Sequence, residues 1–70
     1  MQVQEVQSLQ NYLRKLFMTD KIILTFPKDA DSPVEVSIGQ EFIGVIYRNF
    51  EEGEISYDFN MAILPEDLQE

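Results

Sequence analysis

The fold is decided by residues 34–48, which read VEVSIGQEFIGVIYR. β-Branched and aromatic residues alternate with polar residues on both sides of Gly39 and Gln40, and glycine supplies the positive φ that a two-residue hairpin turn requires. The cross-strand pairs that follow from this turn are Ile38 with Glu41, Val36 with Ile43, and Val34 with Val45. The stretch therefore predicts an antiparallel hairpin of strands 34–38 and 41–48.

The flanking segments predict one further strand on each side and a helix at the start of the chain. Residues 22–26 and 54–63 are β-type runs, and 49–53 forms an acidic hairpin loop before the second of them. Residues 3–18 carry an apolar stripe with spacings of three and four, at Val6, Leu9, Leu13, Leu16 and Phe17. Pro27–Pro33 is predicted to be a loop. We expect one small α+β domain over residues 1–70, in which the N-terminal helix packs on one face of a four-stranded antiparallel meander sheet. Residues 64–70 form a C-terminal tail.

The predicted registers divide the strand residues between two faces. If Arg48 opposes Glu54 across the acidic loop, both hairpins place their apolar pairs on the same face. That core face comprises Val34, Val36, Ile38, Ile43, Val45, Tyr47, Ile55, Tyr57, Phe59 and Met61, joined by Ile22, Leu24 and Phe26. A shift of one residue in either hairpin would expose its apolar set, so the agreement supports the layout.

The opposite face contains the candidate protein contact. It is expected to present the apolar residues Ile23, Phe42 and Ile46, with Gly44 between the last two. Such residues on a solvent face suggest a contact surface. Coverage by the tail, through Ile63, Leu64, Pro65 and Leu68, and contact with a second copy of the chain are equally open at this point.

Acidic residues gather on the same predicted face and in the loop beside it. Glu35 and Asp58 are expected to flank Gly44, and the candidate acidic surface comprises Glu35, Asp58, Glu51, Glu52 and Glu54. Two carboxylates about 9–10 Å apart would suit inverting acid/base chemistry. A flat sheet face gives little depth for a substrate, however, and the loop lacks the ligand spacing of a calcium loop. We therefore expect a solvated acidic surface with no catalytic residue and no metal site.

Composition narrows the function further. The chain has 70 residues, 13 acidic and 5 basic residues, a net charge of -8, and no His, Cys or Trp. Imidazole or thiol catalysis, zinc fingers, disulfides and iron–sulfur ligation are thereby excluded. Net acidity disfavours contact with nucleic acid phosphates and with anionic membrane surfaces. No run approaches the roughly 20 apolar residues of a membrane span. We expect a cytoplasmic protein without a cofactor.

Two segments resemble a known family. They are residues 36–48, VSIGQEFIGVIYR, and residues 53–64, GEISYDFNMAIL. The chain resembles an uncharacterised domain-of-unknown-function family of small acidic bacterial proteins, found mainly in alphaproteobacteria. The likeness covers nearly the whole chain and differs mainly in the loop Pro27–Pro33 and the Gln-rich start. It implies no substrate, cofactor or catalytic residue.

The sequence thus favours a non-enzymatic protein-interaction module that binds a protein partner or a second copy of itself. An acidic electrostatic regulator, which engages a basic protein surface, is the alternative. Salt distinguishes the two, because electrostatic binding weakens as ionic strength rises.

Overall fold

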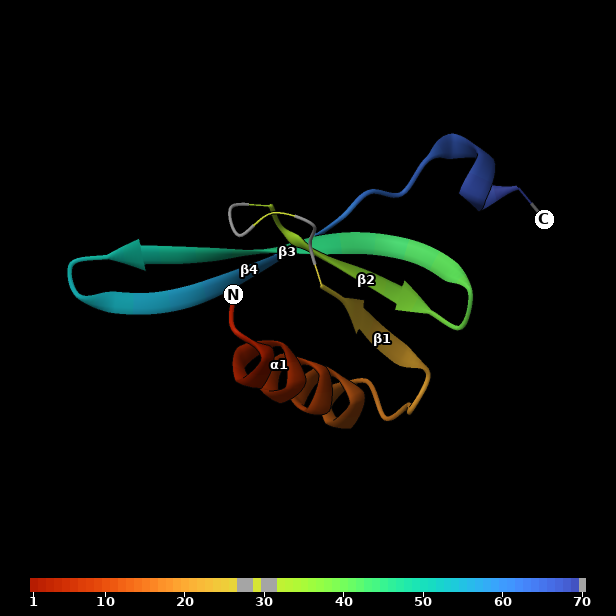
Figure 1. Cartoon of the computed structure of the whole chain (residues 1–70). Helices are drawn as coiled ribbons and strands as arrows, with labels where there is room; N and C mark the ends of the chain where they lie inside the picture. The colour runs from red at the N-terminus through yellow and green to blue at the C-terminus, as the bar shows by residue number, and fades with distance from the viewer. Residues whose placement is uncertain (27–28, 30–31, 70) are drawn as a thin grey trace.

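The structure is a computed structural model that describes residues 1–26, 29 and 32–69. Its elements are α1 (Val3–Leu16), β1 (Ile22–Thr25), β2 (Val34–Ile38), β3 (Glu41–Glu51), β4 (Glu54–Met61) and a short 3-10 helix η1 (Pro65–Leu68). The four strands form one antiparallel sheet in the order β1-β2-β3-β4, with α1 against one face (Figure 1). The predicted α+β fold is confirmed. The predicted loop Pro27–Pro33 lies largely outside the described residues.

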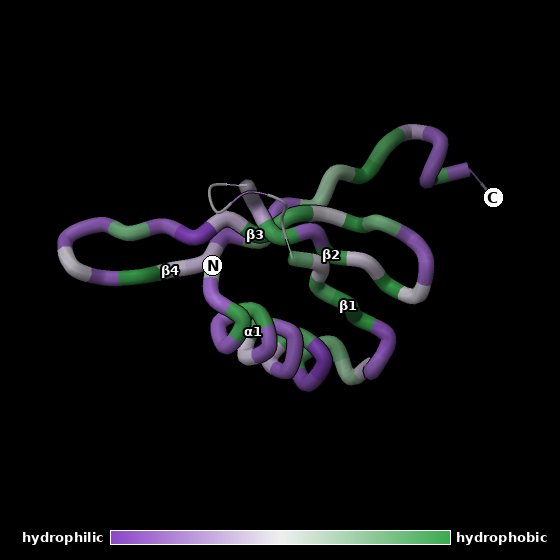
Figure 2. The backbone as a smooth tube through the Cα atoms, viewed as in Figure 1, coloured by the Kyte–Doolittle hydropathy of each residue, from purple (hydrophilic) through white to green (hydrophobic). Residues whose placement is uncertain are grey.

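The core lies between α1 and the face of the sheet that we call the helix side. Its buried members are Val6 and Leu13 of α1 and the strand residues Ile22, Leu24, Val34, Val36 and Ile46. Leu9, Ile43 and Phe59 pack at its margin. Figure 2 shows apolar residues of α1 and of β1 in this layer. Burial of these aliphatic side chains, at about 25 cal/mol per Å² of apolar surface, is the main stabilising term.

Helix α1 is fixed over β1, which forms one edge of the sheet. The side-chain oxygen of Gln10 accepts a hydrogen bond from the Leu24 N–H (3.0 Å), and Arg14 Nε donates to the Ile22 carbonyl (2.8 Å). These two side chains satisfy backbone groups that an edge strand would otherwise leave open. The helix therefore lies toward the β1 edge and away from β4.

The helix ends two residues before the predicted position 18. Met18 has a φ of 54°, and the Thr19 N–H donates to the Arg14 carbonyl (3.0 Å) while the Met18 N–H donates to the Lys15 carbonyl (3.3 Å). This pair of bonds is a Schellman motif, which usually has glycine at the left-handed position. Since Met18 takes that place, the sequence offers no glycine to mark the end.

The predicted register between β2 and β3 is right at the turn and wrong beyond it. Ile38 pairs with Glu41 as expected, but Val36 pairs with Gly44 and Val34 with Ile46. The register shifts between Val36 and Ser37, so one residue of β3 is inserted as a β-bulge. Beyond the bulge, every residue of β3 faces the side opposite to the predicted one.

The register between β3 and β4 is also corrected, by three residues. Arg48 pairs with Tyr57, not Glu54, and the hairpin closes at Glu51 and Glu54 across a turn of two residues. Both turn residues have positive φ, 52° at Glu52 and 79° at Gly53, as in a type I′ turn. The predicted loop 49–53 is therefore mostly strand. Beyond the end of β2, the β3–β4 hairpin continues as a two-stranded arm that projects from the sheet (Figure 1).

These two corrections change the face assignment of β3 alone. Val45 and Tyr47 lie on the outer face, and Gly44 and Ile46 lie on the helix side, contrary to prediction. The helix side of β4 carries the residues predicted for it, Ile55, Tyr57, Phe59 and Met61. The bulge moves the residues of β3 to the opposite face, and the shift of three residues in the β3–β4 pairing then returns those of β4 to the predicted face. Phe26 is exposed and lies beyond the end of β1.

Gly44 is required by close packing in the middle of the sheet. A Cβ atom built on it would collide with the Asn60 carbonyl oxygen and would lie 2.8 Å from Cε1 of the Phe59 ring. The ring occupies the space that a side chain would fill, which is a common reason for glycine within a strand.

Gly44→Ala should therefore lower the free energy of unfolding by about 1–3 kcal/mol, the usual cost of forcing an extra methyl into a packed site. Urea denaturation followed by circular dichroism, at one fixed protein concentration, measures this loss. Gly39→Ala is the matched control. Its added Cβ atom meets open space, so the only cost is the strain of alanine at a φ of +61°, about 1 kcal/mol. Equal losses for the two variants would contradict the packing argument.

Candidate functional site

The structure separates the predicted protein contact into two groups. Ile46 is 1% exposed and Gly44 is buried, so both belong to the helix side and neither can form an outer contact. Ile23 (45% exposed) and Phe42 (58% exposed) do lie on the outer face, where both pair with Ser37 from opposite sides. The four residues therefore do not form one surface, and the bulge is the reason.

The predicted carboxylate pair is also not assembled. Glu35 pairs with Val45, Asp58 pairs with Tyr47, and the neighbours of Gly44 are Val36 and Met61. Asp58 accepts a hydrogen bond from the side-chain amide of Asn49. Glu35 and Asp58 thus share the outer face without facing each other across Gly44.

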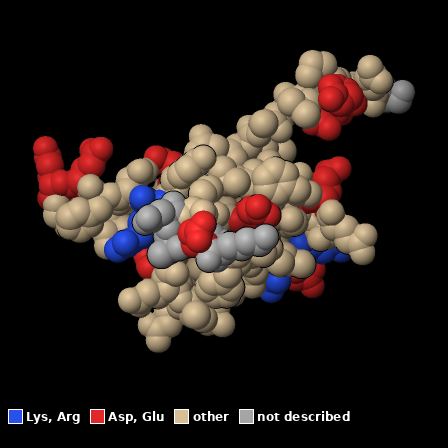
Figure 3. Space-filling view, turned by 45° about the horizontal axis from the view of Figure 1, so that its top comes forward, with Lys and Arg blue, Asp and Glu red and all other residues tan. Residues whose placement is uncertain are grey.

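The other acidic candidates occupy the far end of the arm. Glu51, Glu52 and Glu54 are all exposed around the type I′ turn. Figure 3 shows this acidic tip at the left of the molecule, well away from the body of the sheet. Within the described part of the chain, no group of three or more acidic side chains is arranged to hold a metal ion.

The tail does not cover the outer face, which was one of the two predicted alternatives. Ile63, Leu64 and Leu68 are all more than half exposed, so they do not bury the outer face. Leu64 and Asp67 line a cavity of about 450 Å³ with residues 42–45 and the end of β4. The tail thus lies beyond Met61, beside the first residues of β3.

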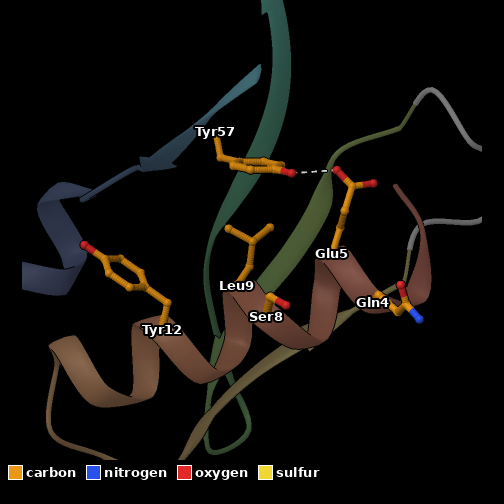
Figure 4. A pocket seen from close by; sticks show the side chains of 6 residues that line it. All are labelled: Gln4, Glu5, Ser8, Leu9, Tyr12 and Tyr57. Atoms are coloured by element: carbon orange, nitrogen blue, oxygen red, sulfur yellow. Dashed lines mark hydrogen bonds between the residues drawn. The ribbon is translucent and has the colours of Figure 1, made fainter. Parts of the chain in front are cut away.

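An apolar groove lies between α1 and β4 on the helix side. One wall is the flank of α1 that carries Leu9 and Tyr12, and Tyr57 of β4 lies opposite them (Figure 4). The groove has a volume of about 340 Å³ and is also lined by Gln4, Glu5 and Ser8. It exists because α1 lies toward β1, so the helix side of β4 and of the arm stays exposed at Phe50, Ile55 and Tyr57.

Glu5 connects the two walls at one end of the groove. Its Oε2 accepts a hydrogen bond from the Tyr57 hydroxyl (2.6 Å) and lies 3.0 Å from Arg48 Nε, while Oε1 accepts one from the Gln2 N–H (3.0 Å). Tyr57 and Arg48 are cross-strand partners at the base of the arm. Glu5 therefore ties the start of α1 to the arm, and we name these three side chains the Glu5 cluster.

The cluster changes the acidity of two of its members. The Gln2 N–H, the Tyr57 hydroxyl and the positive charge of Arg48 together lower the pKa of Glu5 below 4.5. The hydrogen bond to the Glu5 carboxylate raises the pKa of Tyr57 above 10.0. Glu5 thus stays ionised and Tyr57 stays protonated over the neutral range, which is the state that holds the bond between them.

The groove was not predicted from the sequence. The register error concealed that Arg48 and Tyr57 are neighbours, and nothing local in the chain links Glu5 to residues more than 40 positions away. One signal was present, because a single amphipathic helix about 10 Å wide cannot cover four strands spaced about 4.8 Å apart.

Glu5→Gln should remove an acid-dependent part of the stability. Because folding lowers the pKa of Glu5, the contribution of its carboxylate to the free energy of unfolding is complete above pH 4.5. It is lost as the pH falls through the lowered pKa. The difference in the free energy of unfolding between wild type and variant should therefore shrink as the pH falls below 4.5. Glu35→Gln, on the outer face, is the matched control. A difference for Glu5→Gln that does not vary with pH would contradict the role of the cluster.

Comparison with known proteins gives a family and no further relative. No helix among the described residues is long and apolar enough to cross a membrane. No curated protein and no solved structure matches the chain. The taxonomic range expected from the sequence, and the acidity of other members, stay predictions. The model of one family matches residues 5–67, which include all four strands and most of α1 and η1, and the chain therefore belongs to the DUF3126 family of proteins of unknown function.

Proposed function

We propose that the protein is a small non-enzymatic protein-interaction module that associates with a second copy of itself through the helix side of β3 and β4. The observation that supports this proposal is the open groove between α1 and β4 and the apolar face that continues from it. The function expected from the sequence is kept, and its surface is moved from the outer face to the helix side.

The helix side of the hairpin is apolar along most of its length. Of its apolar members, Ile55 is 47% exposed, Tyr57 37% and Met61 55%, whereas Ile46 and Gly44 are buried in the core. Phe50 of the arm is 66% exposed, and Tyr12, which lines the groove, is 60% exposed. The outer face of the same strands carries Val45 with Asn60, Tyr47 with Asp58, and Asn49 with Ser56. Along the arm and β4, the helix side is therefore the more apolar face and is closer in character to an interface core.

A second copy suits this face because the single chain buries little. Among the described residues, seven apolar side chains are buried, which is few for a chain of 70 residues. Small domains with limited cores commonly gain stability by oligomerisation. Large side chains already held on a rigid sheet lose little conformational entropy on association.

The acidic regulator remains a second candidate because the acidic tip is exposed at the end of a projecting arm. Glu51, Glu52 and Glu54 would meet a basic surface before the rest of the molecule does. This function predicts binding to a basic probe such as poly-lysine that weakens with salt and is lost when the three glutamates become glutamine.

Sedimentation equilibrium at low and high salt tests the self-association. We expect a dimer that tightens as salt rises, because each copy carries a charge of -8 and salt screens the repulsion. Tyr12→Ser should weaken the dimer about tenfold by removing an exposed aromatic wall of the groove, whereas Asn11→Ser, at the adjacent exposed position, should have no effect. A monomer at every concentration and at both salt levels would overturn the proposed function.

A further inference from the structure

The two edges of the sheet are treated differently. At the β1 edge, the side chains of Gln10 and Arg14 bind the open backbone groups of Leu24 and Ile22. At the β4 edge, we find no hydrogen bond to the outward backbone groups from any residue that the structure describes. An eight-residue strand with no proline and no lysine, left open in this way, is a template for pairing with another strand.

The turn determines which groups of β4 point outward. Glu51 and Glu54 flank a two-residue turn, so they exchange backbone hydrogen bonds, and every second residue of β4 from Glu54 onward does the same with β3. The N–H and C=O groups of the remaining residues point away from the sheet. These residues are Ile55, Tyr57, Phe59 and Met61, whose side chains are also the ones on the helix side.

We propose that β4 pairs with β4 of a second copy, antiparallel about a two-fold axis at Tyr57, so that two sheets become one sheet of eight strands. This inference rests on the self-association proposed above and adds its geometry. In this arrangement Tyr57 meets Tyr57 of the second copy, and Ile55 meets Phe59. The outward N–H and C=O groups of Ile55, Tyr57 and Phe59 then face those of the second copy.

Charge selects this register from its neighbours. With the axis at Tyr57, Asp58 lies opposite Ser56 and Glu54 lies opposite Asn60. An axis at Asp58 would place this carboxylate against its own copy, and an axis at Ser56 would place Asp58 against Glu54; like charges directly opposite are destabilising. An axis at Phe59 also separates the charges, but it overlaps only residues 57–61 of β4, whereas the axis at Tyr57 overlaps residues 54–60.

The pairing also agrees with the rest of the molecule. The tail leaves β4 after Met61 and lies beside residues 42–45, so it does not cover Ile55–Phe59. The two arms point in opposite directions, which separates the acidic tips by about 30 Å at 3.4 Å per residue. That distance exceeds the Debye length of about 10 Å in 0.1 M salt. The partner strand extends the floor of the groove with its own Tyr57 and Phe59.

The first test replaces one outward N–H. Ile55→Pro removes a donor that the β3–β4 ladder does not use, so the monomer keeps its fold, as proline on an open edge generally allows. By symmetry the dimer loses two hydrogen bonds, and we expect it to weaken at least about tenfold. Ile55→Ala, the matched control, removes the side chain but keeps the N–H, and should weaken the dimer less. Sedimentation equilibrium measures both, with circular dichroism to check the fold.

The second test places a single cysteine on the axis, because the chain has none of its own. Directly opposed hydrogen-bonded residues have Cα atoms about 5.5 Å apart, a separation that a disulfide spans. Tyr57→Cys should therefore cross-link into a covalent dimer under mild oxidation, and Tyr47→Cys, on the outer face of β3, should not.

A dimer whose affinity is unchanged by Ile55→Pro, or in which both cysteine variants cross-link equally, overturns the β4 pairing but leaves self-association intact. A protein that never dimerises overturns both.

Discussion

The whole arrangement depends on one constraint: a single helix must cover a sheet of four strands. Helix α1 spans 14 residues and is about 10 Å wide, while four strands need nearly 20 Å. Gln10 and Arg14 hold the helix toward β1, so the uncovered width falls on β4 and on the arm. The same contacts that close one edge of the sheet therefore leave the other edge, and the apolar face beside it, open to a partner.

Two local features determine what that open face presents. The bulge in β3 turns Ile46 toward the core and gives Gly44 the position where the Phe59 ring needs space. The Glu5 cluster then fixes the base of the arm against α1, since an isolated two-stranded ribbon is only marginally stable. Together they hold the helix side of β4 in a defined orientation, which lowers the entropic cost of pairing with another strand.

Elements and their order could be predicted from sequence because apolar periodicity and turn residues are local signals. The faces of β2 and β4 were also predictable, whereas the face of β3 was not. Residues 42–47, FIGVIY, are apolar at both odd and even positions apart from Gly44, so the sequence does not reveal the residue inserted at the bulge. Ile46 was therefore wrongly assigned to the surface. The groove was missed for a different reason, since Glu5, Arg48 and Tyr57 meet only after the arm has its true register.

Amide hydrogen exchange is the measurement that tests most directly whether the open edge of β4 is an interface. The N–H groups of Ile55, Tyr57 and Phe59 point outward, and those of Ser56 and Asp58 point to β3. Protection of the three outward amides should rise with protein concentration, while that of the two inward amides should be high throughout. Outward amides that exchange freely at concentrations where the protein is dimeric would contradict an interface at β4.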